Sequence, residues 1–360
     1  MHTFRYLHTS ARRLNITTAV FPGQGNVNRH IFQLTQNEIA KSNEFSKQYI
    51  DFINYSQSIV PNVAIAKYFN FRTYPDESTL KMELAQTSFV QPLVLLATYM
   101  NYKIIKDTHN WDVVNNTNYM LGHSLGELGT LVVQGVMSLE DGLRAAHQRG
   151  LLMEKTLEVH KMQNRGVQNW GMVALMFRER DFNSILKVCQ EDVGLNVANI
   201  NGYEQIVVSG EVGEMKIKLQ KLDTIQKDMV KMKIWKSKIR KVWLQTEIPA
   251  HNPILADMET ELHEIIKLQS ETLRVPVVCN LNGLVVTKNA QRVVDNFVKV
   301  TSKPVQFTKC LEEIIAAHQG TDKFRFVNVS DVTYGLLKRF FKTSENCEVY
   351  DLIDDSSKPV

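Results

Sequence analysis

The feature that most constrains the fold is the stretch from 118 to 135, where an apolar run meets a tight glycine turn and a second apolar segment follows. Residues 118–121 predict a strand, "GHSLG" at 122–126 predicts the turn, and 125–133 predict a helix that ends at Gly135. A strand that passes directly into a helix is the repeating unit of sheets covered by helices. The stretch therefore indicates an α/β fold with a mostly parallel sheet.

The rest of the chain alternates in the same way, with one interruption. Between about 171 and 248 the predicted elements follow the order β-α-β-β-α-β, which is that of a ferredoxin-like unit. We expect a large α/β-hydrolase-like body with this unit inserted as a subdomain. The expected boundaries are a body at 17–168 and 249–343, an insert at 169–248 and a C-terminal tail at 344–360.

The N-terminus is basic and rich in hydroxyl side chains. The first acidic residue is Glu38, and Arg5, Arg12, Arg13 and Arg29 precede it. This composition is typical of a mitochondrial presequence, which we place at 1–16, and it predicts a protein of the mitochondrial matrix. A basic terminus without a targeting role is the alternative.

Cysteine and histidine spacing argues against a metal centre. The four cysteines lie far apart without a CxxC pair, and the ten histidines include no HxxxH or HExxH pattern. No window has the roughly 18 consecutive apolar residues of a membrane span. We therefore expect a reduced compartment, no metal, no cofactor and no membrane span.

Ser124 is the candidate nucleophile. It lies in the Gly-x-Ser-x-Gly turn, where a cramped strand-to-helix junction exposes the hydroxyl and directs the first helical amides, beginning with Leu125, toward an oxyanion. A glycine-rich turn with an incidental serine is the alternative. The predicted strand before the turn and helix after it favour the catalytic interpretation.

His251 is the candidate base. A serine needs a base within hydrogen-bond reach, and His251 lies in "EIPAHNP" (247–253), directly after a predicted strand, where a loop can direct it into a cleft. The neighbouring His123 diverges from Ser124 in a sharp turn, and we expect it to pack beside the site. Three further histidines are expected to be structural or solvated, namely His147, His263 and His318.

Arg149 lies among small and apolar residues of the predicted helix 139–156. A guanidinium there is costly unless an anion pairs with it. The partner is either a substrate carboxylate, which a bidentate fork would select, or an internal carboxylate; a snorkelling stem is the third interpretation.

Four stretches now form one ordered pattern: "FPGQG" (21–25), "QTSFVQPL" (86–93), "GHSLGEL" (122–128) and "EIPAHNP" (247–253). With Arg149 and the inserted unit, the chain from about 17 to about 341 resembles the malonyl-CoA:acyl carrier protein transacylases. With its basic N-terminus it looks like a mitochondrial member serving fatty acid synthesis.

The resemblance implies a ping-pong mechanism. Ser124 would take the malonyl group from malonyl-CoA, with His251 as base and then acid, and the phosphopantetheine thiol of acyl carrier protein would accept it. The amides of Gln24 and Leu125 would form the oxyanion hole, and Arg149 would bind the malonyl carboxylate. Two asparagines of "VANING", Asn199 and Asn201, match a stretch that lines the thiol-substrate channel, although a simple hairpin role is equally consistent.

Two departures from the family pattern stand out. Val300 occupies a position where the family often has Gln, and only its backbone carbonyl could orient the histidine. The segment 216–241 carries ten Lys or Arg against two Asp. It is either a docking surface for the acidic carrier protein or a solvated helix and loop. Nucleic-acid binding is not expected, because Trp235 and Trp243 form no evident stacking platform.

Two other functions are consistent with parts of the pattern. A serine esterase or thioesterase that hydrolyses an acyl-CoA would use the same turn, but it would place its histidine late in the chain. A non-catalytic homologue that scaffolds the carrier protein would not need Ser124 and His251. We favour a monomeric acyltransferase.

Overall fold

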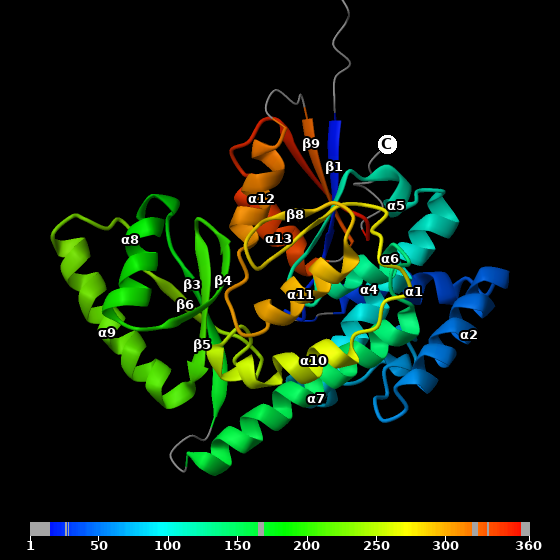
Figure 1. Ribbon diagram of the computed structural model, residues 1–360, viewed down its shortest axis with the longest axis horizontal. Coiled ribbons are helices and arrows are strands. Elements are labelled where there is room, and N and C mark those ends of the chain that lie inside the picture. Colours follow the sequence, from blue (N-terminus) through cyan, green and yellow to red (C-terminus); the bar gives the residue numbers. More distant parts are fainter. Residues whose placement is uncertain are drawn as a thin grey trace, which may run out of the picture.

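The computed structural model describes residues 15–25, 27, 29–164, 169–318, 323–329 and 331–353. Its larger sheet has six strands in the order β10-β9-β1-β2-β7-β8, and every neighbouring pair is parallel except β7 and β8 (Figure 1). The strands are β1 (Asn15–Phe21), β2 (Tyr119–Gly122), β7 (Val277–Val278), β8 (Val285–Val286), β9 (Lys323–Asn328) and β10 (Cys347–Asp351). The mostly parallel α/β sheet expected from the sequence is present.

Alternation along β1 explains why helices cover both faces of this sheet. Ala19 and Phe21 pack into one apolar core, whereas Ile16 and Val20 pack into another, as the two-residue period of a strand requires. The first core is built with α1 (His30–Ala40), α2 (Glu44–Ile59), α4 (Thr87–His109), α6 (Gly126–Val133), α7 (Leu139–Gln163), α10 (Glu259–Ile265) and α11 (Ala290–Val300). The second core is built with α12 (Phe307–Ala316) and α13 (Asp331–Phe340).

The remaining helical segments are short and connect these elements. They are η1 (Ala66–Phe69), α3 (Glu77–Ala85), α5 (Val113–Asn116) and η4 (Pro253–Met258). None of the helices in the described part of the chain is long and apolar enough to cross a membrane.

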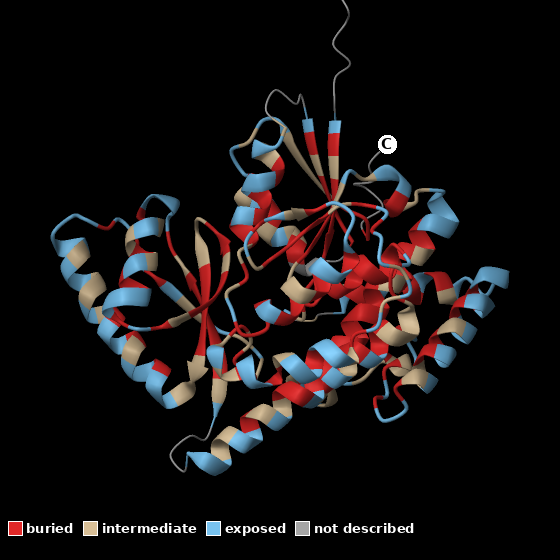
Figure 2. Ribbon diagram, in the orientation of Figure 1, coloured by how far each residue is buried: buried red, intermediate tan, exposed pale blue. Residues whose placement is uncertain are grey.

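The smaller sheet is antiparallel, in the order β4-β5-β3-β6. Its chain order is β3 (Trp170–Met176), η2 (Glu179–Asp181), α8 (Phe182–Lys187), η3 (Val188–Asp192), β4 (Asn196–Gly202), β5 (Gln205–Glu211), α9 (Val212–Lys231) and β6 (Arg240–Trp243). One face packs on α8 and α9, and the other carries Met172, Ala174, Ala198 and Val207. Figure 2 shows the exposed outer side of α9 at the edge of the molecule.

Several boundaries differ from those expected. The last strand of the small sheet was expected at 242–248 but ends at Trp243, and the helix expected at 139–156 continues to Gln163. The segment expected as a C-terminal tail, 344–360, contributes β10, which pairs in parallel with β9. Residues 1–14 of the expected presequence lie outside the described part of the chain. Its last two residues, 15 and 16, belong to β1.

Candidate active site

Ser124 lies in a strained turn between β2 and α6. Its φ is 52°, in the left-handed region that a serine rarely adopts. The flanking glycines are required by close approach: a Cβ on Gly122 would lie 2.0 Å from the amide nitrogen of Glu127, and one on Gly126 would lie 2.4 Å from the carbonyl oxygen of Phe21. The glycines therefore allow β2, the turn and α6 to pack directly against the end of β1.

His251 completes a nucleophile–base pair. Its Nε2 lies 2.8 Å from Ser124 Oγ, and its Nδ1 lies 2.6 Å from the carbonyl oxygen of Val300. Because a carbonyl can only accept, Nδ1 must carry the proton, and this leaves the lone pair of Nε2 facing the hydroxyl. The carbonyl of Val300 thus orients the histidine, and its valine side chain is not needed for that contact.

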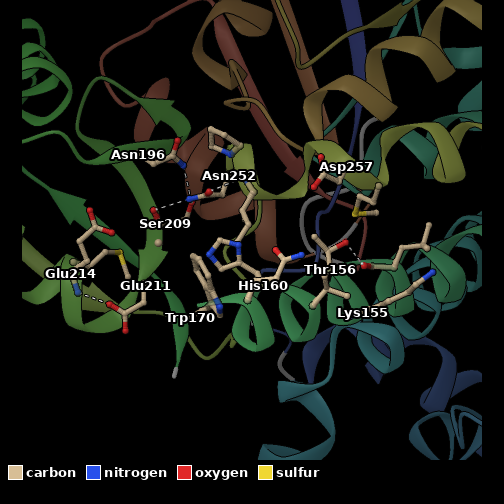
Figure 3. A pocket seen from close by; sticks show the side chains of 18 of the residues that line it. Lys155, Thr156, His160, Trp170, Asn196, Ser209, Glu211, Glu214, Asn252 and Asp257 are labelled. Atoms are coloured by element: carbon tan, nitrogen blue, oxygen red, sulfur yellow. Dashed lines mark hydrogen bonds between the residues drawn. The ribbon is translucent and has the colours of Figure 1, made fainter. Parts of the chain in front are cut away.

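The loop that holds His251 is tied to the small sheet. Asn196 Nδ2 donates to the carbonyl oxygen of His251 at 3.2 Å and to Ser209 Oγ at 2.9 Å, and Asn252 Nδ2 donates to the Ser209 carbonyl at 3.2 Å. These side chains line a separate hollow of about 720 Å³ between α7 and the small sheet (Figure 3). Hydrogen bonds from β4 and β5 thereby support a residue whose φ of 58° is itself unusual.

Burial keeps His251 uncharged. Its pKa is lowered from 6.5 to about 3, chiefly by loss of solvent; the hydrogen bond to Val300 acts in the opposite direction, and the positive charge of Arg149 contributes to the lowering. The residue is only 2% exposed. At neutral pH the imidazole is therefore in the form that can accept a proton.

This pKa predicts the acid limb of the reaction. As the pH falls through 6.5, His251 in the folded protein stays neutral, so the kcat/KM of serine acylation should decline only as the pH approaches about 3. The free energy of unfolding should fall as the pH drops from 6.5 to about 3, because over this range the unfolded chain binds a proton on this histidine and the folded chain does not. Acylation rates measured across this range test the prediction; a limb near 6.5 would contradict it.

Arg149 is buried beside this pair. The residue is 3% exposed, donates from one guanidinium nitrogen to Gln91 Oε1 at 2.9 Å and from another to Thr301 Oγ1 at 3.4 Å, and stacks on the ring of Phe297. Burial lowers its pKa to about 10, and the Glu127 carboxyl opposes that shift.

The contacts of Arg149 decide between the interpretations drawn from the sequence. Its Nε has no hydrogen-bond partner, and no ion pair joins it to a carboxylate among the described residues. Because its head is buried, a snorkelling stem is excluded. Its neutral partners leave the positive charge able to bind an anion.

One cavity of about 450 Å³ joins these groups. It is lined by Ser124, His251, Arg149 and Gln24, together with Asn199 and Asn201 from β4. The inner face of the small sheet forms the opposite wall. Leu125, the N-cap residue of α6, follows Ser124 directly. The structure thus brings every candidate site residue to one place.

The other histidines have local partners. His123 packs on Phe307 and lies 2.8 Å from Asn201 Oδ1. The three histidines expected to be structural or solvated each have a hydrogen-bond partner: His147 contacts the carbonyl of Ser88, His263 contacts Asp295, and His318 contacts Tyr119. The basic segment 216–241 includes α9, which covers the face of the small sheet that points away from the cavity.

The sequence did not identify four residues that shape the site. Gln91 and Thr301 hold Arg149, and Asn280 and Glu127 contact the turn around Ser124. Gln91 and Glu127 were within two of the quoted stretches, so their positions gave a signal; Thr301 and Asn280 are ordinary polar residues whose partners lie elsewhere in the chain.

The chain is similar in sequence to known proteins that share one name. No protein-family model matches the chain. A malonyl-CoA:acyl carrier protein transacylase of Staphylococcus aureus is 26% identical over 277 residues, covering 76% of this chain and 80% of that protein. A mitochondrial transacylase of Saccharomyces cerevisiae with the same name is 27% identical over 267 residues, covering 68% and 69%.

The fold of this chain is shared with a solved structure. The crystal structure of a malonyl-CoA:acyl carrier protein transacylase from Xanthomonas oryzae pv. oryzae superposes with a TM-score of 0.69 at 24% identity, covering 95% of both chains. Both sequence relatives are malonyl-CoA:acyl carrier protein transacylases, and the solved structure shares the fold of this chain.

Proposed function

We propose that this protein transfers the malonyl group of malonyl-CoA to the phosphopantetheine thiol of acyl carrier protein, through a malonyl ester on Ser124. The observation that carries the proposal is the 2.8 Å contact between Ser124 and His251. The same cavity contains the buried Arg149, which forms no ion pair with a carboxylate among the described residues. A nucleophile and base alone fit any acyl transfer, whereas a buried cation beside them favours an acyl group that ends in a carboxylate.

The first half-reaction loads the enzyme. His251 Nε2 takes the proton of Ser124 Oγ as the oxygen attacks the thioester carbon, and the amides of Gln24 and Leu125 receive the developing oxyanion. The carbon–sulfur bond then breaks, and His251 returns the proton to the departing CoA thiolate. Malonyl-CoA is converted to free CoA and a malonyl ester.

The second half-reaction unloads it. The carrier-protein thiol gives its proton to His251 and attacks the ester, and the proton passes to Ser124 as the carbon–oxygen bond breaks. Asn199 and Asn201 line the cavity where this thiol would enter. The scheme draws only on side chains and amides of this chain, and the CoA thioester is a substrate rather than a cofactor.

Several finer assignments accompany this proposal. The basic start of the sequence and the mitochondrial relative in yeast support a role in mitochondrial fatty acid synthesis, in the matrix, with a presequence at 1–16. The enzyme is proposed to act as a monomer. The chain order of β3 to β6 supports a ferredoxin-like insert at 169–248 in an α/β-hydrolase-like body.

Intact-mass measurement after mixing with malonyl-CoA tests the proposal. A transferase should hold the malonyl adduct without acceptor and release it to a carrier protein that bears phosphopantetheine. A thioesterase would instead hydrolyse malonyl-CoA rapidly with no acceptor present, and that result would overturn the transferase assignment. A carrier protein lacking phosphopantetheine is the matched control and should leave the adduct in place.

A further inference from the structure

Asn280 contacts the turn around Ser124 from the strand next to β2. It follows the short strand β7 and is fully buried. Its side-chain oxygen accepts from the Ser124 amide at 2.6 Å, and its side-chain nitrogen donates to the Gly122 carbonyl at 2.6 Å. One amide side chain therefore spans the turn and satisfies a donor and an acceptor on either side of His123.

These two bonds act where the backbone is least favourable. The φ of 52° at Ser124 costs free energy and persists only when the surroundings fix it. The same contact occupies the amide of Ser124, so that amide cannot serve the oxyanion. Stabilisation of the oxyanion is left to the amides of Leu125 and Gln24, and the direction of the Leu125 amide depends on the conformation of the turn.

Glu127 anchors Asn280 in turn. The carboxyl lies in the first turn of α6, is fully buried, and accepts from the Asn280 amide at 2.8 Å through Oε1. Burial raises its pKa to about 8, with the Asn280 amide and Arg149 acting in the opposite direction, so the group can occupy this apolar site without charge. Asn280 is thus joined to the turn by its side chain and to the following helix by its backbone.

We propose that Asn280 is a positioning residue for Ser124, which fixes the strained turn by bridging Ser124 and Gly122 and is itself held by Glu127. The inference rests on the proposed function in taking Ser124 as the nucleophile. Asn280 lies outside the cavity lining, so it should affect the rate of acylation and not the affinity for the substrate. Arg149 and the cavity walls, which would bind the malonyl group, are untouched by its removal.

Single-turnover acylation of Asn280→Leu tests the proposal. Leucine has a similar shape but leaves the Ser124 amide and the Gly122 carbonyl without partners. We expect the saturating acylation rate to fall about 100-fold, with the half-saturating concentration of malonyl-CoA unchanged within about twofold, because binding groups stay in place.

Asn101→Leu is the matched control. Asn101 is also a fully buried asparagine, and its side chain donates to the carbonyls of Ile31 and Val329, away from the cavity. It should lower the melting temperature yet acylate at the wild-type rate. An Asn280→Leu protein that is folded and acylates at the wild-type rate would overturn the proposal.

A second variant covers the case in which Asn280→Leu fails to fold. In Asn280→Asp the side chain can still accept from Ser124, but once ionised it cannot donate to Gly122 or to the Cys310 thiol, and its own backbone amide still donates to the Glu127 carboxyl. Its acylation rate should fall as pH rises, in a titration additional to that of Glu127, which both proteins share; identical pH profiles would count against the proposal.

The proposed function and this inference can fail separately. If the wild type takes up no malonyl group, the proposed function fails. The rate at which a fluorophosphonate labels Ser124 still reports the geometry of the turn in that case, and equal labelling of wild type and Asn280→Leu would overturn the positioning role alone.

Discussion

Replacing Ser124 by alanine is expected to abolish the malonyl adduct and to lower transfer to the carrier protein by at least about 10⁴-fold. The variant keeps His251, Arg149 and the cavity but lacks the oxygen that attacks the thioester. Residual transfer would have to proceed directly from CoA to the carrier thiol, without the covalent step that divides the reaction. Intact mass and a transfer assay on the same samples measure both effects.

Ser56→Ala provides the control for this experiment. Ser56 is also buried and its hydroxyl donates to the Phe52 carbonyl at 2.9 Å within α2, so its loss removes a similar group from another part of the body. This variant should form the adduct to full stoichiometry. An adduct that persists in Ser124→Ala would place the acyl group on another residue and refute the assignment.

Replacing Arg149 by alanine should change the acyl preference of the enzyme. Malonyl transfer is expected to fall by about 10²–10³-fold, equivalent to about 3–4 kcal/mol, since the malonyl carboxylate would be buried without its cation. Acetyl transfer should be retained or increased, because an acetyl group has no carboxylate to desolvate. Acylation rates with malonyl-CoA and acetyl-CoA, measured side by side, give the ratio directly.

Arg144→Ala is the matched control on the same helix. Its guanidinium is exposed and pairs with Glu140 one turn away, so its removal should leave both acyl groups transferred at wild-type rates. Equal losses of malonyl and acetyl transfer in Arg149→Ala would instead mean that Arg149 serves the packing of α7 through Gln91 and Thr301.

The sequence predicted those parts of the site that local pattern determines. The strand–turn–helix around Ser124 follows from two glycines between apolar runs, and the proline-bracketed loop singled out His251 among ten histidines. The mostly parallel sheet followed from alternating elements. In each case neighbours within a few positions restrict the backbone, so a reading along the chain is sufficient.

The parts that it could not predict depend on distant partners. Asn280 is an ordinary residue after a short strand, and its role arises only when β7 lies beside β2. Glu127 would be expected at the surface of a helix, yet the packing of α6 buries it. Strand β10 was expected as a tail because pairing with β9 is not encoded in its own polar–apolar pattern strongly enough to separate it from coil.

The acceptor that orients His251 is a peptide oxygen, and it therefore has an unusual relation to mutation. Every amino acid at position 300 supplies a carbonyl, so no codon change there deletes the contact with Nδ1. A scan of single substitutions would detect Ser124 and His251 but would miss the Val300 carbonyl that orients the histidine. The side chain at 300 is constrained by its burial in the apolar core, not by the contact with His251, so only a change in the backbone path, or chemical replacement of that peptide unit, would expose what the carbonyl contributes.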